Sequence, residues 1–235
     1  MIILVKLILA HLLGDFLLQP DQWVKEKEEK KLRSFKLYVH AFIHGGLAML
    51  LVWDIYFWGP ALVIMLTHGL IDGLKLVIQK ENNKRQWFFI DQLLHLLIII
   101  IIWYYWQDIP ITLGSLVSEQ RLIYLTAIVA ITIPASVGIK IFISKWAPDT
   151  RDPENESLQN AGKYIGIFER LFVLAFVLTG HWEAIGFLIA AKSVFRFGDL
   201  KDSKDRKLTE YILIGTLLSF GIALVIGIIV LQLTR

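Results

Sequence analysis

The feature that most constrains this chain is a series of long apolar runs, such as LLHLLIIIIIWYYW at residues 93–106. Hydrophobic residues make up 56% of its 235 residues, above the roughly 45–50% that is usual in soluble domains. Runs of about 20 apolar residues are long enough to cross the hydrocarbon of a bilayer. There, only helices and closed barrels satisfy their own backbone hydrogen bonds. The sequence therefore predicts an all-α, polytopic membrane helical bundle.

We expect about eight transmembrane helices, at residues 1–19, 35–58, 60–79, 86–106, 121–145, 163–180, 183–197 and 208–233. The seventh is short for a full span. Lys and Arg are concentrated in alternate connections, at residues 20–34, 80–85, 146–162 and 198–207. Because basic loops stay on the cytoplasmic side, both termini are predicted to lie outside (N-out and C-out) in a bacterial inner, or cytoplasmic, membrane.

The chain is expected to have three parts. These are a four-helix His/Asp membrane bundle at 1–106, a fifth helix and cytoplasmic linker loop at 107–162, and C-terminal membrane helices with an ion-pair cluster at 163–235. The chain has no cysteine, which excludes disulfides, thiolate metal sites and a cysteine nucleophile. Its net charge is only +3, which gives little electrostatic support for binding nucleic acid.

Four pairs of ionisable residues share a four-residue spacing in the motifs HLLGD, HAFIH, HGLID and DQLLH. Residues i and i+4 lie on one face of a helix, as in helices that offer two ligands to zinc. With depth counted from each cytoplasmic end at about 1.5 Å per residue, all eight groups lie at a similar depth in the cytoplasmic half of the bilayer. They are predicted to face each other and to bind a metal: His11, Asp15, His40, His44, His68, Asp72, Asp91 and His95.

Other roles are open for such a set of residues. A single intramembrane His–Asp pair is usually an interhelical hydrogen bond, and such residues also form proton pathways. Hydrogen bonds between membrane helices average only about 0.6 kcal/mol, so four equally spaced pairs are hard to explain as packing. A haem held by two histidines is a further alternative, against which the three carboxylates argue. We favour one or two divalent metal ions, zinc first, with iron or manganese as alternatives.

The second half of the chain has a different set of intramembrane charges: Glu169, Arg170, Lys192 and Arg196. Glu169 with Lys192 or Arg196 is typical of a buried ion pair that fixes helix packing. Alternatively, the four residues form an anion-binding pocket for a headgroup, because Arg binds phosphate or carboxylate through two parallel hydrogen bonds.

The motifs AHLLGDFLLQ, HGLIDGLK and IDQLLHLL resemble a family of bacterial integral membrane proteins of unknown function. The stretches FERLFVLAFVLTGHWEAIGFLIAAKSVFRFGDLK and EYILIGTLLSF look like the second half of its longer members. This resemblance implies no particular reaction. A looser similarity to membrane-bound metal-dependent hydrolases raises the expectation of hydrolysis.

The expected activity is metal-dependent hydrolysis of a lipid-linked or membrane-associated substrate near the cytoplasmic leaflet, with a metal-activated water as nucleophile. Asp72 or Asp91 is predicted to be the catalytic general base. A proton or divalent-metal transporter or channel is the leading alternative. However, the outward sections of three helices, GGLAMLLVW, ALVIML and LIIIIIW, contain no ionisable side chain. A non-catalytic membrane sensor or scaffold would leave the His and Asp pairs unexplained.

Overall fold

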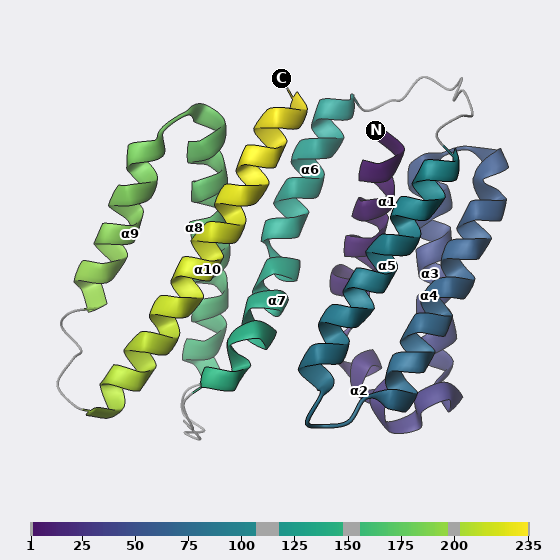
Figure 1. The fold of residues 1–235 in the computed structure, drawn as a ribbon, viewed down its shortest axis with the longest axis horizontal. Helices are drawn as coiled ribbons and strands as arrows, with labels where there is room; N and C mark the ends of the chain where they lie inside the picture. The colour runs from purple at the N-terminus through teal and green to yellow at the C-terminus, as the bar shows by residue number, and fades with distance from the viewer. Residues whose placement is uncertain (1, 107–117, 148–155, 197–202, 235) are drawn as a thin grey trace. The chain divides into compact units, whose positions relative to one another are not determined.

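The computed structural model describes residues 2–106, 118–147, 156–196 and 203–234, with side chains for all of these except 156–161, 195–196 and 203–208. The described residues are helical apart from short turns (Figure 1). The chain forms two units, Met1–Leu122 and Ile123–Arg235, and each has an apolar core of its own. The three-part division expected from the sequence remains a prediction.

The first unit is built on four long helices: α1 (Ile2–Leu12), α3 (Phe35–Val52), α4 (Trp58–Ile78) and α5 (Lys84–Trp106). α1 contacts both α3 and α5, α3 contacts α4, and α4 contacts α5, so the four close into a bundle. Leu7, Val52, Phe57 and Ile99 are among the residues of its core. Large apolar side chains also point outward, as on any helix that faces lipid rather than water; Leu70, for example, is 71% exposed.

Two stretches of the first unit differ from the sequence prediction. The connection expected at 20–34 contains a helix, α2 (Asp21–Lys30), followed by the turn η2 (Lys31–Arg33). Its residues are almost all polar, so the sequence lacks the periodic apolar residues that would predict a helix there. The helix expected at 35–58 ends early, because Trp53 adopts a left-handed conformation with φ 57°. A short turn, η3 (Ile55–Phe57), then leads into α4.

The remaining long helices are α6 (Glu119–Ile131), α7 (Ile133–Ile143), α8 (Glu156–Thr179), α9 (Trp182–Arg196) and α10 (Ser203–Thr234). A short turn, η4 (Ser144–Trp146), follows α7. In the second unit α8 packs against α7, α9 and α10, around Val173, Val177 and Phe220. The single helix expected at 121–145 is interrupted at Thr132. A proline in the first turn of α7 explains the break, because it has no N–H to continue the hydrogen bonds of α6.

Five helical stretches in the described parts of the chain are long and apolar enough to cross a membrane: Phe35–Val52, Ile55–Ile78, Lys84–Trp106, Glu119–Trp146 and Thr209–Thr234. A sixth is added if Ile2–Leu17 and Asp21–Arg33, bent by 81°, count as one broken span. α9 has 15 residues, which is short for a full crossing. The all-helical, membrane-like character predicted from the sequence is confirmed. Eight full spans and their orientation remain predictions.

Candidate metal centre

Four helical segments of the first unit carry the paired His and Asp residues into one buried region, which we call the His–Asp layer. It consists of His11 and Asp15 from α1 and the turn after it, His40 and His44 from α3, His68 and Asp72 from α4, and Asp91 and His95 from α5. The side chain of Asp15 is 10% exposed, and the other seven residues are at most 6% exposed. The structure therefore brings together all eight residues that the sequence spacing selects.

Asp15 enters this layer from a stretch of unusual helix. Leu13–Leu17 form η1, a π-helical turn, in which the Leu18 N–H donates to the Leu13 carbonyl at 2.9 Å. Such turns are rare and are frequent at functional sites. Gly14 of this turn lies directly against the imidazole of His44. The winding of the chain and the absence of a side chain at Gly14 thus let Asp15 and His44 approach each other.

One oxygen of Asp15 is the point on which three imidazoles converge. Asp15 Oδ1 lies 3.2 Å from His40 Nε2, 3.0 Å from His44 Nε2 and 3.4 Å from His68 Nε2. The Nε2 atoms of His40 and His68 are 3.1 Å apart. Two ligand atoms of a tetrahedral zinc ion, each bonded at about 2.0–2.1 Å, are separated by roughly 3.3 Å. The donor atoms are therefore spaced as ligands of one ion are spaced.

Several of these buried atoms have no hydrogen-bond partner within the part of the chain that the structure describes. They are His11 Nδ1, His40 Nδ1, Asp91 Oδ1, His95 Nδ1 and His95 Nε2. Leaving a buried polar group unpaired costs about 1–3 kcal/mol, so native proteins rarely collect so many in one place. A bound cation that accepts their lone pairs would remove this cost.

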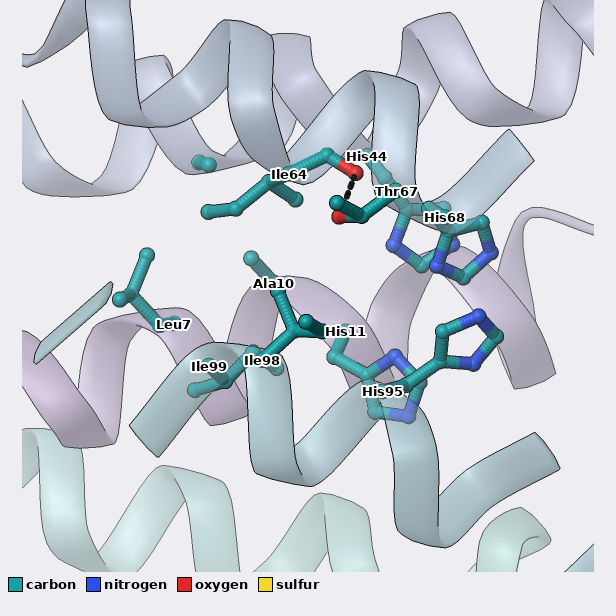
Figure 2. Close-up of a pocket in the computed structure, with 11 residues that line it drawn as sticks. Leu7, Ala10, His11, His44, Ile64, Thr67, His68, His95, Ile98 and Ile99 are labelled. Atoms are coloured by element: carbon teal, nitrogen blue, oxygen red, sulfur yellow. Dashed lines mark hydrogen bonds between the residues drawn. The ribbon is translucent and has the colours of Figure 1, made fainter. Parts of the chain in front are cut away.

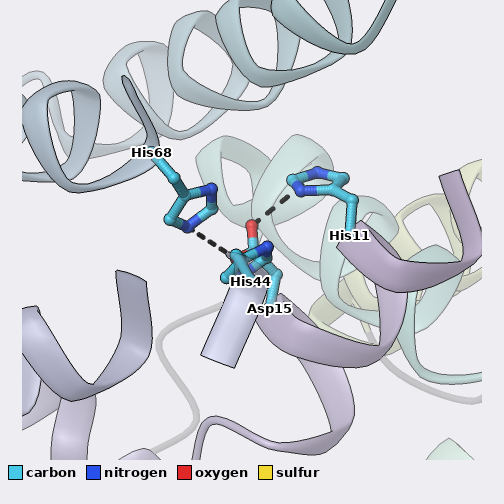
Figure 3. A group of neighbouring side chains, drawn as sticks. All are labelled: His11, Asp15, His44 and His68. Atoms are coloured by element: carbon cyan, nitrogen blue, oxygen red, sulfur yellow. Dashed lines mark ion pairs between the residues drawn. The ribbon is translucent and has the colours of Figure 1, made fainter. Parts of the chain in front are cut away.

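Three groups of side chains in the described residues are close enough to share an ion, with ligand atoms within 4.8 Å of one another. The first position is formed by His11, Asp15, His44 and His68, which point toward one another in Figure 3. The second position is formed by His40, His68 and Asp72. The third group is Asp15, Asp91 and His95. Buried His/Asp clusters that could hold a metal ion are thus present, although nothing in them identifies the metal.

Two lysines, neither of them expected from the sequence, neutralise two of the three carboxylates. Lys27 of α2 donates to Asp72 Oδ2 at 2.7 Å, and Lys75 of α4 donates to Asp91 Oδ2 at 2.9 Å. Lys75 had a signal, because it ends the motif HGLIDGLK and shares a helix face with Asp72. No sequence signal indicated a role for Lys27, since it lies in a hydrophilic stretch outside every motif. With neutral imidazoles, the layer keeps one net negative charge, on Asp15.

Gln92 is a third residue that the sequence interpretation missed, although it stands inside the motif DQLLH. Its Nε2 donates to Asp15 Oδ2 at 2.7 Å and to Asp91 Oδ2 at 3.3 Å. Its Oε1 lies 3.2 Å from His11 Nε2 and accepts the proton of that nitrogen. The lone pair of His11 is then on Nδ1, the atom without a partner. Gln92 therefore orients a histidine and a carboxylate, as residues behind metal ligands do.

A small cavity lies beside the imidazoles of His11, His44, His68 and His95 (Figure 2). Thr67 and apolar side chains, among them Leu7, Ile64 and Ile98, line the rest of it. It offers about 20 Å³ to the centre of a water-sized molecule, slightly more than one water needs. The cavity therefore has room for water next to the candidate ligands, and a larger substrate group would require the bundle to open.

The charged residues of the second unit are arranged differently. Lys192 donates to Glu169 Oε2 at 2.6 Å, one of the two ion pairs that the sequence predicts. Arg170 is buried and donates only to neutral groups among the described residues: the carbonyls of Ile131 and Thr132 and the hydroxyls of Ser136 and Ser219. The side chain of Arg196 lies outside the described residues. An anion-binding role for these four residues remains a prediction.

Comparison with known proteins gives one match. Residues 3–124 match a family model described as a protein of unknown function, DUF3307. This stretch is more than half of the chain and contains the whole His–Asp layer together with Lys27, Lys75 and Gln92. No curated protein and no solved structure matches the chain. The match agrees with the resemblance to an uncharacterised family, whereas none of the comparisons supports the looser similarity to hydrolases.

Proposed function

Since the chain belongs to the DUF3307 family, whose function is unknown, we propose a function from the His–Asp layer. The protein is a membrane-embedded metal-dependent hydrolase that acts on a lipid-linked or membrane-associated substrate near the cytoplasmic leaflet. One observation carries this proposal. The Nε2 atoms of three buried histidines converge around Asp15 Oδ1, and further His and Asp atoms of the layer have no hydrogen-bond partner among the described residues, beside a cavity with room for water.

The charge of the layer favours a single divalent ion at the first position. Lys27 and Lys75 already balance Asp72 and Asp91, which leaves the charge of Asp15. One divalent ion would bring the layer to one net positive charge, and a second would bring it to three. Charge inside a membrane protein is costly, so the first ion is much easier to accommodate than the second. Three histidines and one carboxylate suit zinc, with iron or manganese as alternatives.

The residues around the first position have separate roles in this proposal. The ion would supply polarisation of a water molecule and of the bond to be cleaved. Asp91 is the better candidate for the general base, because its Oδ2 is held by Lys75 while its Oδ1 is free of hydrogen bonds within the described structure. Asp72 is the second candidate, and its Oδ2 is held by Lys27. Gln92 and the two lysines orient these carboxylates.

The proposed topology has eight spans, with both termini outside a bacterial inner membrane. Its basis is the alternation of basic and uncharged connections along the sequence. The position of α2 supports this topology, because this helix, with its three lysines, lies next to the His–Asp layer. It contacts α3, and the turn η2 that follows it contacts α4. The layer then lies close to the cytoplasmic headgroups, which is where a lipid-linked substrate presents its polar part.

Transport of protons or divalent ions is the second candidate. The layer of intramembrane histidines and carboxylates is a feature that transport proteins share. Against it, the cavity is lined, apart from the four histidines, by apolar residues and by Thr67, whose hydroxyl already donates to backbone carbonyls. This lining resembles a pocket closed on one side more than a path for ions.

The first experiment is metal analysis of the full chain, purified in detergent without chelator. We expect about one zinc ion per chain in the wild type and a loss of most of it in His44→Ala and His68→Ala variants. His181→Ala is the matched control, because His181 is exposed and lies outside the layer. A wild type with no more metal than the His44→Ala variant would overturn the proposal.

The second experiment separates hydrolysis from transport. The metal-loaded protein is incubated with a panel of phospholipids, phosphate esters, amides and esters in detergent, and ion flux is measured in sealed liposomes. Metal-dependent cleavage that is lost in a folded Asp91→Asn variant supports the hydrolase. Flux of protons or zinc without cleavage of any member of the panel would replace it by the transporter.

A further inference from the structure

α2 is attached to the bundle in an unusual way. It is a ten-residue helix of sequence DQWVKEKEEK, and Lys27 is its one buried residue. A helix packed for stability normally buries an apolar stripe. Here the buried side chain is a charged one, 5% exposed, and it reaches into the His–Asp layer. The contact of α2 with the layer is therefore electrostatic and depends on what else binds Asp72, whereas Glu28 of the same helix is held separately by Lys84 of α5.

The ammonium group of Lys27 occupies part of the second position, formed by His40, His68 and Asp72. Lys27 Nζ is 2.7 Å from Asp72 Oδ2, the oxygen that also lies 3.7 Å from His40 Nε2. His68 Nε2 is 3.1 Å from His40 Nε2 and 4.0 Å from Asp72 Oδ1. His40 is 1% exposed, and its Nδ1 has no partner within the described structure. A divalent ion held by this triad would need the carboxylate that Lys27 now binds.

We propose that the triad of His40, His68 and Asp72 is a second divalent-cation site, closed in this structure by Lys27, so that an ion and α2 compete for Asp72. This inference rests on the proposed metal centre, because it assumes that the His–Asp layer takes up an ion. The ligand class is a divalent cation that accepts nitrogen and carboxylate ligands, such as zinc.

The charges explain why the competition is balanced. An ion that enters the second position while Lys27 stays would put two cations on one carboxylate. An ion that displaces Lys27 adds only one net charge to the layer, which is the least costly way for a divalent ion to enter the second position. The two positions also share a ligand, since both include His68. An ion in the second position therefore competes for His68 with one at the first, and α2 closes the second position through Lys27.

The test isolates the second position in the full chain. A His11→Ala, His44→Ala variant lacks two ligands of the first position and keeps the triad, and its zinc affinity is measured in detergent. Adding Lys27→Met removes the competing ammonium. Because apparent affinity falls with the fraction of molecules in which the site is free, we expect zinc to bind about tenfold more tightly or better. Lys30→Met is the matched control, since Lys30 is on the same helix and its side chain is 60% exposed. Unchanged affinity after Lys27→Met would overturn the inference.

A second measurement does not depend on the folding of the Lys27 variant. The His11→Ala, His44→Ala variant, which keeps Lys27, is treated with an amine-acylating reagent with and without zinc, and modified lysines are located by mass spectrometry. Zinc should raise the acylation of Lys27 several-fold relative to Lys30, because the displaced ammonium becomes accessible. Zinc bound to this variant with Lys27 still unreactive would overturn the inference and leave the first position intact. A wild type that binds no zinc at all would instead refute the proposed function.

Discussion

A Cβ atom on Gly14 would lie 2.4 Å from Nε2 of His44, closer than real side chains approach. The Gly14→Ala variant must therefore push the His44 imidazole away from Asp15 or unwind the π-helical turn. Overpacking of this kind costs about 1–3 kcal/mol of stability. Displacement of a ligand should weaken zinc binding by about tenfold or more, measured by zinc titration of the detergent-purified protein.

The matched control for this change is Gly46→Ala on α3, where an added Cβ meets no atom within 4 Å. It should leave zinc affinity unchanged. Equal affinities of the two variants would mean that His44 does not contribute to the first position as its geometry suggests.

Gln92 offers a test of the residues behind the ligands. In Gln92→Leu, Asp15 Oδ2 and His11 Nε2 lose the amide that orients them. Loss of such support typically reduces metal affinity about 10–100-fold, and we expect the zinc dissociation constant to rise in that range. Gln86→Leu, at an exposed position of the same helix, is the control. A Gln92→Leu protein with wild-type affinity would show that the amide only fills space.

The eight residues of the His–Asp layer were predictable because their signal is local. A four-residue spacing puts His68 and Asp72 on one face of a helix whatever surrounds it. The cost of burying polar groups in lipid then forces such faces together. The length of the apolar runs placed most helix ends within a few residues of their observed positions, while eight full spans remain a prediction.

The features that were not predictable depend on tertiary contacts or on small changes of winding. Lys27 is in a stretch that reads as solvated loop, and only the docking of α2 shows that it reaches Asp72. The π-helical turn at Asp15 has no sequence signal, whereas the proline that follows Thr132 was a signal for the break that the prediction did not use. Gln92 is adjacent to Asp91 in sequence, but its role follows from the positions of His11 and Asp15 on other segments.

The roles of the carboxylates can be separated by measuring metal content and turnover together. Asp91→Asn should keep its zinc, because the four residues of the first position are untouched. Once a substrate is known, its turnover should fall about 10²–10⁴-fold, the usual contribution of a general base. Asp54→Asn, a change at a turn outside the layer, should alter neither quantity. Retained turnover in Asp91→Asn would transfer the role of general base to Asp72.

Arg170 supports the break between α6 and α7, and its removal should affect stability and leave the metal in place. The guanidinium donates to two carbonyls at the break, Ile131 and Thr132, and to the hydroxyl of Ser219 on α10. Hydrogen bonds between membrane helices contribute about 0.6 kcal/mol on average and up to about 1.7. Arg170→Met, which breaks several of them, should therefore cost roughly 2–4 kcal/mol, seen as a lower unfolding temperature in detergent.

Arg121→Met, at an exposed position of α6, is the control and should leave that temperature within error. Zinc content should be unchanged in both variants, because every ligand lies between residues 11 and 95. Loss of zinc in a folded Arg170→Met protein would contradict this separation of roles.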